Sequence, residues 1–396
     1  MQQPNSAKPV ILYVIPSLAF GGAEIQALQQ LNYLHRQGFE VYLIVLSEIS
    51  DFPIPIQFPE KQIEVLGFLY SSLIFNAVQK SFALVLPLLQ FIQKRQITHV
   101  IAHLPLSHWV MRLVKMRQKI SGQATIQLIQ YHHAIQYEEN PLDTFSKKAF
   151  NAFNSQLAKQ VDDSNIFVSK AAFDNISKYL HIQNPKIIHN AVIENRVGKE
   201  LALHYLQKEG IKQADFCMVL PGRVLAEVKG HGLLIAAFQT LQQRFGWEVG
   251  EVKVIFAGGG RSIPALKEKI ATVKLIDFFH FTDFIENTLL LSFLQLADVV
   301  VIPSIAEGFG NVAVEGLMQQ STVLCSNAGG LKEIITDGFN GWVFEAGNVE
   351  QLTDKLAYLY QHRHEKLLDK NALLEDFRQR FTIEGQKKQL LDFLKL

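Results

Sequence analysis

Residues 298–317 read DVVVIPSIAEGFGNVAVEGL and contain, in order, an apolar strand pattern, a Pro-Ser turn, a glycine loop and a helical pattern. Two glutamates, Glu307 and Glu315, stand on either side of the loop. The glycine loop and the helix start offer backbone N–H groups to a phosphate, and each carboxylate can accept hydrogen bonds from hydroxyls. This stretch therefore predicts a site for a nucleoside diphosphate that carries a sugar.

The alternation of short apolar strands and longer helical stretches continues along the whole chain. We expect strands at residues 10–15, 40–46, 99–102, 125–130 and 166–168, and a second series at 216–220, 252–257, 277–281, 299–302 and 321–325. Strands that alternate with helices predict parallel sheets with right-handed crossovers. Two such series predict an α/β protein with two Rossmann-like domains.

The domain boundaries follow from the two series of strands. We place the N-terminal domain at residues 1–193, the C-terminal domain at 201–380, and a last helix at 381–396 that we expect to pack back on the N-terminal domain. Ligands of open α/β sheets bind beyond the carboxyl ends of the strands. Candidate site residues are therefore sought directly after predicted strands.

Composition excludes several classes of protein. The chain has 396 residues, a net charge of +1 and two cysteines, Cys217 and Cys325. This charge gives no general affinity for nucleic acid, and two distant cysteines in apolar runs indicate buried free thiols rather than a disulfide framework. The longest apolar segment, 82–92, is too short to span a bilayer, and the N-terminus lacks a secretory pattern. We expect a cytoplasmic protein.

Further strand ends carry cations and glycines. Arg223 follows the strand at 216–220, and Lys229 precedes the next helix. Together they suit a diphosphate, to which Arg offers a fork and Lys a point charge. Gly22, in the turn after the first strand, and Gly258, after the strand at 252–257, leave room for close approach by a ligand. The alternatives are solvated loop charges and ordinary tight turns.

Histidines end two strands of the first series. His132 and His133 follow the strand at 125–130, and His103 follows the strand at 99–102. A histidine at such a position can bind sugar hydroxyls or act on the reacting group. Single histidines are more often structural, so we favour the pair, and His133 before His132.

One segment of the first domain is basic and contains no acid. Residues 65–137 include no Asp or Glu, and seven basic residues: Lys80, Lys94, Arg95, Arg112, Lys115, Arg117 and Lys119. The segment is also rich in aromatic and aliphatic residues. This pattern suits an anionic membrane surface or a lipid-phosphate acceptor, and the alternative is a solvated helix face. We assign Lys80, Arg112, Lys115, Arg117 and Lys119 to this candidate surface.

Taken together, these motifs resemble family 4 of the retaining glycosyltransferases, which has the GT-B fold of two facing Rossmann-like domains. The resemblance is strongest in residues 304–347, where the Glu-x7-Glu pair precedes a Gly-Gly-x-x-Glu-Ile run at 329–334 and a Asp-Gly-x-Asn-Gly run at 337–341. The order of Gly22, Arg223 and Lys229 also matches the family. Thr282 stands where the family usually has glycine, and the spacing from Arg223 to Lys229 is one residue longer than usual.

The resemblance implies a role for each matching residue. Arg223 and Lys229 would bind the diphosphate, Glu307 the donor sugar and Glu315 the ribose. His133 would be the cleft histidine beside the transferred sugar, with Gly22 near the phosphate and the acceptor. The loop whose amides meet sugar and phosphate would be Phe309, Gly310, Asn311 and Val312, and Gly258 would lie near the base or ribose.

We accordingly expect a metal-independent, cofactor-free retaining transferase that uses a nucleotide sugar, with a UDP-sugar favoured. The expected acceptor is a glycan or lipid-linked glycan of bacterial surface polysaccharide, either lipopolysaccharide or capsule. The expected location is the inner face of the cell membrane. Two alternatives stay open: a nucleotide-sugar 2-epimerase of the same fold, and a non-catalytic partner that binds a nucleotide sugar.

Overall fold

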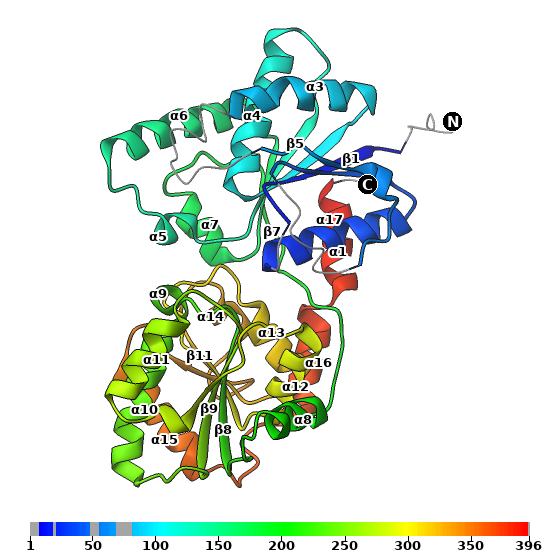
Figure 1. Cartoon of the computed structure of the whole chain (residues 1–396). Coiled ribbons are helices and arrows are strands. Elements are labelled where there is room, and N and C mark those ends of the chain that lie inside the picture. Colours follow the sequence, from blue (N-terminus) through cyan, green and yellow to red (C-terminus); the bar gives the residue numbers. More distant parts are fainter. Residues whose placement is uncertain (1–7, 19–20, 48–54, 69–80, 395–396) are drawn as a thin grey trace. The chain divides into compact units, whose positions relative to one another are not determined.

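The protein is described by a computed structural model that covers residues 8–18, 21–47, 55–68 and 81–394, with the backbone alone at Glu139. Its contacts divide the chain into two compact units (Figure 1). Unit 1 comprises the chain up to Asn190 together with the C-terminal residues from Gln386, and unit 2 comprises Ala191–Gly385. Each unit is built around one parallel sheet, as the alternating pattern predicts.

The sheet of unit 1 has the strand order β3-β2-β1-β4-β5-β6-β7, with every pair parallel. Its central strands are buried because they are continuous apolar runs, as in VILYVI of β1. The strands are β1 (Val10–Ile15), β2 (Glu40–Val45), β3 (Ile63–Val65), β4 (His99–His103), β5 (Gln127–His132), β6 (Ser164–Phe167) and β7 (Pro185–Ile187).

Helices cover both faces of this sheet. On one face α3, α4 and α6 share a single apolar core with β1, β2, β4 and β5. On the other, α17 joins α1, since Gln386 Nε2 donates to Gln26 Oε1 at 3.0 Å and the Lys387 ammonium lies over the Tyr33 ring (Figure 1). The helices are α1 (Gly22–Arg36), η1 (Glu60–Gln62), η2 (Phe82–Leu84), α3 (Val85–Lys94), α4 (Leu104–Ile120), α5 (Gln136–Glu139), α6 (Phe145–Val161), α7 (Lys170–Ile176) and α17 (Ile383–Leu394).

Unit 2 has a six-stranded sheet in the order β10-β9-β8-β11-β12-β13, again wholly parallel. The strands are β8 (Phe216–Pro221), β9 (Val252–Ala257), β10 (Phe279–Phe281), β11 (Val299–Ile302), β12 (Val323–Ser326) and β13 (Trp342–Phe344). The helices are α8 (Glu200–Lys208), α9 (Ala226–Lys229), α10 (His231–Phe245), α11 (Ile263–Thr272), η3 (Ile276–Phe278), α12 (Asn287–Leu296), α13 (Asn311–Met318), α14 (Leu331–Ile334), α15 (Val349–Gln361) and α16 (Lys370–Arg380).

The strand order reverses once in each sheet, between β1 and β4 in unit 1 and between β8 and β11 in unit 2. Ligands of doubly wound sheets bind at such reversal points, where the two loops diverge to opposite faces. In unit 1, Gly22 comes after β1 and His103 is the last residue of β4. In unit 2, Arg223 comes after β8 and Glu307 after β11. The topology therefore puts the candidate residues of each unit at its natural ligand position.

The predicted strands are all present, with ends shifted by one or two residues. The largest shift moves the expected strand at 125–130 to Gln127–His132, so that His132 ends the strand and His133 follows it. Three further strands, β3, β7 and β13, were missed because each has only three residues. A run of three residues is too short for the period of a strand to show in the sequence.

Candidate functional site

Close backbone contact joins the loops that follow β8 and β11. Gly230 adopts the left-handed conformation, with φ of +69°, and a Cβ at this position would lie 1.9 Å from the carbonyl oxygen of Pro303. Nearby, the Ile305 N–H donates to the carbonyl of Val228 at 2.8 Å. The two loops are therefore held together by main chain, and only glycine fits at position 230.

This contact places Lys229 beside Glu307. The Lys229 ammonium lies 2.6 Å from Glu307 Oε2, with side chains 27% and 16% exposed, and the Ser304 hydroxyl donates to the same oxygen at 3.1 Å. Sequence reasoning assigned both charged residues to the donor but missed their pairing and the contribution of Ser304. The cation and the carboxylate of this pair neutralise one another.

The loop that follows β12 packs directly against the glycine loop before α13. A Cβ on Gly329 would lie 1.7 Å from the carbonyl oxygen of Glu307, and the Gly330 N–H donates to that oxygen at 3.1 Å. Phe309 is buried and its ring packs near Phe381, so its side chain is a packing group and only its backbone can meet a ligand.

Residues at the start of α13 remain accessible to a ligand. Gly310, the N-cap, is buried against Leu331, whereas Asn311 and Val312 lie half-buried in the first turn. Arg223 is exposed in the loop directly after β8. A helix start and a guanidinium at the reversal point of one sheet provide two kinds of phosphate donor.

Glu315 lies one turn further into α13 and differs from Glu307 in its surroundings. No hydrogen bond or ion pair joins its carboxylate to any other side chain or N–H group in the described part of the chain, although the residue is half-buried. Burial without a compensating partner raises the pKa of Glu315 to about 7. A half-buried carboxylate that lacks protein partners has its full acceptor capacity available for ligand hydroxyls.

Gly258 is required by packing inside unit 2. A Cβ there would lie 2.2 Å from the carbonyl oxygen of Gly222, and the Gly258 N–H donates to Thr282 Oγ1 at 3.0 Å. Thr282, where the family usually has glycine, thus satisfies this N–H within the protein. The space beside Gly258 is therefore filled by the Gly222 carbonyl and its N–H is already bonded, so the room for a ligand expected there is taken by the protein.

In unit 1, His103 and His133 are joined at the ends of neighbouring strands. His103 Nδ1 and His133 Nε2 lie 2.8 Å apart, so one of these nitrogens donates and the other accepts. Both rings stack on Tyr131, and His103 also stacks on Tyr13. This stack was not visible in the sequence because its members come from three strands.

The two histidines are neutral at physiological pH. Burial, with a smaller contribution from His132, lowers the pKa of His133 to about 3, and burial lowers that of His103 well below its usual range. His133 Nδ1 has no partner within the described chain. Because His103 engages the other nitrogen, His133 presents a single ring nitrogen, Nδ1, which donates or accepts according to the tautomer of the pair.

His132 serves the structure of unit 1 instead. Its Nε2 lies 2.9 Å from Asn165 Oδ1, its ring stacks on Phe167, and burial lowers its pKa to about 4. Gly22, the other candidate of this unit, is the exposed first residue of α1. Of the histidine pair, His133 has a buried ring nitrogen without a partner in the described chain, and its part in the site stays a prediction.

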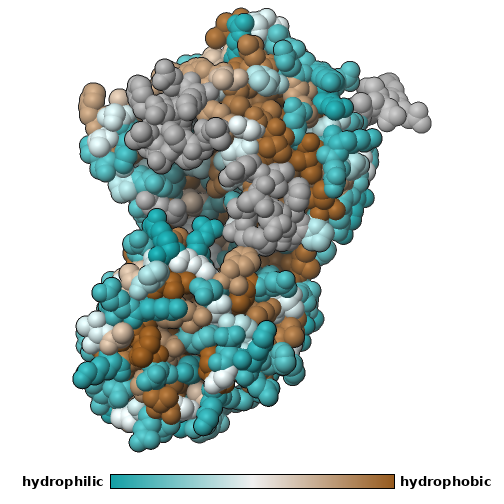
Figure 2. Space-filling model, in the orientation of Figure 1, coloured by the Kyte–Doolittle hydropathy of each residue, from teal (hydrophilic) through white to brown (hydrophobic). Residues whose placement is uncertain are grey.

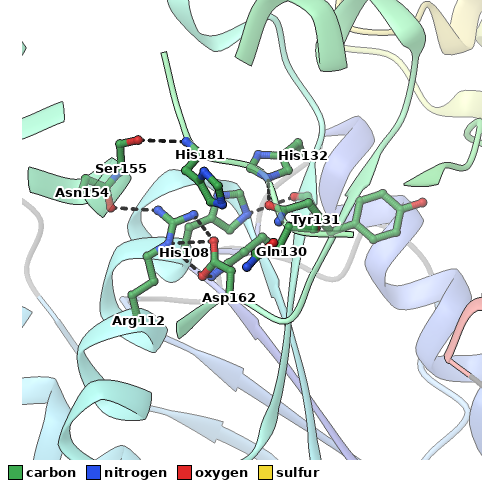
Figure 3. Close-up of polar contacts among 11 residues, drawn as sticks. His108, Arg112, Gln130, Tyr131, His132, Asn154, Ser155, Asp162 and His181 are labelled. Atoms are coloured by element: carbon green, nitrogen blue, oxygen red, sulfur yellow. Dashed lines mark hydrogen bonds and ion pairs between the residues drawn. The ribbon is translucent and has the colours of Figure 1, made fainter. Parts of the chain in front are cut away.

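The assignment of Arg112 and Lys115 to a membrane or acceptor surface was wrong. Arg112 is buried and forms a two-pronged ion pair with Asp162, which also accepts from Gln130 Nε2 (Figure 3). Lys115 is equally buried and pairs with Asp163. Both cations are neutralised inside unit 1 by acids about fifty residues away in the sequence. These acids lie outside residues 65–137, so the charges of that segment alone could not reveal the pairs.

The other members of that assignment have different positions. Arg117 and Lys119 are exposed near the end of α4, where Lys119 donates to the carbonyl of Gln160. Lys80 lies outside the described residues.

Neither a metal-ligand cluster nor a membrane-spanning helix occurs in the described part of the chain. In the described ranges no three His, Cys, Asp or Glu side chains are grouped so that they could hold a metal ion. None of the helices in those ranges has the length and apolar character needed to cross a bilayer. Cys217 and Cys325 are buried free thiols, as predicted.

Two parallel-sheet units with phosphate-binding features at the reversal point of the second define a protein of the GT-B class. The family described as Glycosyl transferases group 1 matches residues 204–379, and the family described as Glycosyltransferase Family 4 matches residues 20–196. These two regions account for most of the chain. The protein therefore belongs to the family 4 type of GT-B glycosyltransferases, which confirms the resemblance.

Individual relatives are more distant. The chain is 30% identical over 217 residues to the uncharacterized glycosyltransferase MJ1178 of Methanocaldococcus jannaschii, a match that covers 53% of this chain and 55% of the relative. Its fold is similar to that of HepE from Anabaena in complex with UDP and glucose, with a TM-score of 0.78, 18% identity and coverage of 98% and 99%. WaaG, a glycosyltransferase involved in lipopolysaccharide biosynthesis, gives a TM-score of 0.73, 14% identity and coverage of 97% and 99%.

The close contact at Gly230 can be tested with a matched pair of glycines. Gly246 has nearly the same left-handed backbone, with φ of +66°, but no atom within 4 Å of an added Cβ. We expect Gly246→Ala to cost only the conformational strain, about 1–2 kcal/mol. Gly230→Ala should destabilise the protein by clearly more, because the loops must also separate. Urea unfolding measures both, and equal losses would contradict the contact.

Proposed function

We propose that this protein is a retaining glycosyltransferase that moves a sugar from a nucleotide-sugar donor, with a UDP-sugar favoured, to an acceptor hydroxyl. The observation that carries the proposal is the group formed by Arg223, Lys229, Glu307 and Glu315 around the start of α13 at the reversal point of unit 2. Supporting it, HepE of the same fold has been solved with UDP and with UDP-glucose.

In this mechanism the bond between the sugar C1 and the diphosphate oxygen breaks as the acceptor oxygen bonds to C1 on the same face. The acceptor proton passes to the leaving phosphate oxygen. Arg223, Lys229 and the amides at the start of α13 stabilise the charge that develops on the diphosphate. Lys229 exchanges its partner Glu307 for phosphate when the donor binds, which releases Glu307 to accept hydrogen bonds from the sugar.

The remaining side chains hold the donor. Glu315, as a carboxylate without protein partners, accepts hydrogen bonds from the ribose hydroxyls. The neutral ring of His133 makes one hydrogen bond to the transferred sugar through Nδ1. None of these roles requires a metal ion or an organic cofactor.

The acceptor that we propose is a lipid-linked glycan of bacterial surface polysaccharide, lipopolysaccharide or capsule, used at the inner face of the cell membrane. WaaG, with the same fold, supports this choice through its part in lipopolysaccharide biosynthesis.

A 2-epimerase is less well supported. Such an enzyme needs acid and base groups about the sugar C2, whereas Glu307 is tied to Lys229 and Ser304 and Glu315 lies further along α13. Analysis of the sugar product without an acceptor separates the two enzymes. A non-catalytic binder would keep its cellular role when Glu307 or Lys229 is replaced.

Release of UDP in the presence of UDP-sugars and a pool of lipid-linked glycans tests the proposed function directly. Lys229→Met should lower kcat on the order of a hundredfold, because one donor to the leaving group is lost. Lys366→Met, which removes an exposed lysine of the same unit, is the control. Absence of nucleoside diphosphate release with every common donor would refute the transferase.

The buried carboxylate of Glu315 predicts opposite effects on stability and on binding. The unfolded chain ionises near the ordinary glutamate pKa, whereas the folded protein retains the proton until about pH 7, so stability falls as pH rises between these values. Without a ligand, Glu315→Gln should therefore raise Tm at pH 8 and leave it nearly unchanged at pH 4.5. With UDP present, the variant should lose most of the ligand-induced rise in Tm.

Thermal unfolding with and without UDP gives both readouts. Glu268→Gln, at an exposed position of α11, is the matched control and should change neither. A Glu315→Gln variant that is less stable at pH 8 and binds UDP normally would contradict the assignment.

The hydrogen bond between His103 and His133 predicts that a smaller side chain at position 103 retains more activity than a larger one. His103→Asn retains an amide near the place of Nδ1 and can still bond to His133, whereas His103→Gln fills more of the buried space but puts its amide near the place of Nε2. If the bond positions His133, the Asn variant should retain more kcat than the Gln variant. A packing role alone would give the reverse order, and Tm values would report that role separately.

A further inference from the structure

Unit 1 exposes large apolar side chains on the helices that cover one face of its sheet. Phe82 in η2 and Leu86 in α3 are 56% and 63% exposed, and Phe145 and Phe153 in α6 are 87% and 59% exposed. We call these four residues the α3–α6 face. In Figure 2 apolar side chains gather over the part of unit 1 where Figure 1 places α3. Apolar side chains grouped in this way mark an interaction surface.

Trp109 of α4 links Phe82 and Phe153 of the α3–α6 face. The Trp109 ring is 6.5 Å from the ring of Phe82 and 6.1 Å from that of Phe153, measured between centroids. Its indole nitrogen donates to Ser81 Oγ at 2.9 Å. Phe145 and Phe153 are eight positions apart, so they project from the same side of α6, two turns from one another. The aromatic groups therefore form one patch on a rigid support.

The charge around the α3–α6 face is mainly positive. The sequences of η2, α3 and α6 contain no acid, and α6 contributes Lys147, Lys148 and Lys159. Lys148 and Lys159 are exposed, while Lys147 pairs with Asp143 at 2.8 Å. Arg117, at the end of α4, adds another exposed cation. The patch thus combines exposed aromatic side chains with exposed cations.

We propose that the α3–α6 face docks on an anionic lipid bilayer. The phenylalanines and Leu86 would enter the boundary between headgroups and acyl chains, and Lys148 and Lys159 would meet the lipid phosphates. A second copy of the chain is a poorer occupant, because a symmetric contact would set lysines against lysines, and Asp143, the acid before α6, is already paired with Lys147. This surface replaces Arg112 and Lys115, which are buried, as the docking residues.

Docking on a bilayer would bring unit 1 to the lipid-linked acceptor, and to that extent the inference rests on the proposed function. Binding to lipid can be measured without sugar transfer. The experiment is flotation of the full chain with vesicles of phosphatidylcholine alone, or of phosphatidylcholine and phosphatidylglycerol in equal parts. We expect the protein to float with the anionic vesicles and to remain behind with the neutral ones.

Two pairs of substitutions assign the binding to this face. Phe145→Ser with Phe153→Ser should lower the fraction bound to anionic vesicles on the order of tenfold or more, because two apolar groups lose their insertion. Lys148→Gln with Lys159→Gln should weaken binding and reduce its dependence on anionic lipid. Phe339→Ser is the matched control, since Phe339 is 59% exposed in unit 2, as Phe153 is in unit 1.

Three outcomes would overturn the proposal: no flotation with anionic vesicles, flotation unchanged by the phenylalanine substitutions, or a dimer in solution that these substitutions dissolve. Thermal unfolding without ligand shows that each variant is folded, because the substituted side chains are exposed and their loss should leave Tm nearly unchanged. If UDP binding and release fail while flotation behaves as expected, the transferase proposal fails alone.

Discussion

Direct contact between main-chain atoms of neighbouring loops is the constraint on which the unit 2 site depends. At Gly230 and Gly329 a carbonyl oxygen occupies the space that a side chain would need. The contact sets Lys229 against Glu307 and leaves the first turn of α13 accessible. Attraction within a part-exposed ion pair contributes little to stability by itself. The charged groups are therefore positioned by the backbone, and their electrostatic energy remains available for exchange with a ligand.

Much of the fold was predictable because parallel strands buried on both faces are continuous apolar runs between helical patterns. The same logic located Arg223, Lys229 and Glu307 after strands of one domain. It could not show that Lys229 pairs with Glu307, because 78 residues separate them and the contact arises only when β8 lies beside β11. The unusual environment of Glu315 was equally invisible, since burial is a property of the packed helix.

The net charge of a sequence segment did not predict the charge of the protein surface. Residues 65–137 contain no acid, but Asp162 and Asp163 reach Arg112 and Lys115 from the end of α6 and the start of β6. A buried arginine without such a partner would be strongly destabilising. The exposed cations lie at the ends of α3 and α4 and on α6, and α6 lies outside the segment that the composition singled out.

Unit 1 is made from both ends of the chain, with α17 packed on α1 through Gln386 and Lys387. A ribosome delivers the first 190 residues long before these contacts can form. Domains generally fold as they emerge from the ribosome, N-terminal first. One flank of α1 in the first unit therefore stays uncovered while all of unit 2 is synthesised. The domain that begins first is thus completed last, and the flank of α1 that Gln386 and Lys387 later contact stays uncovered until then.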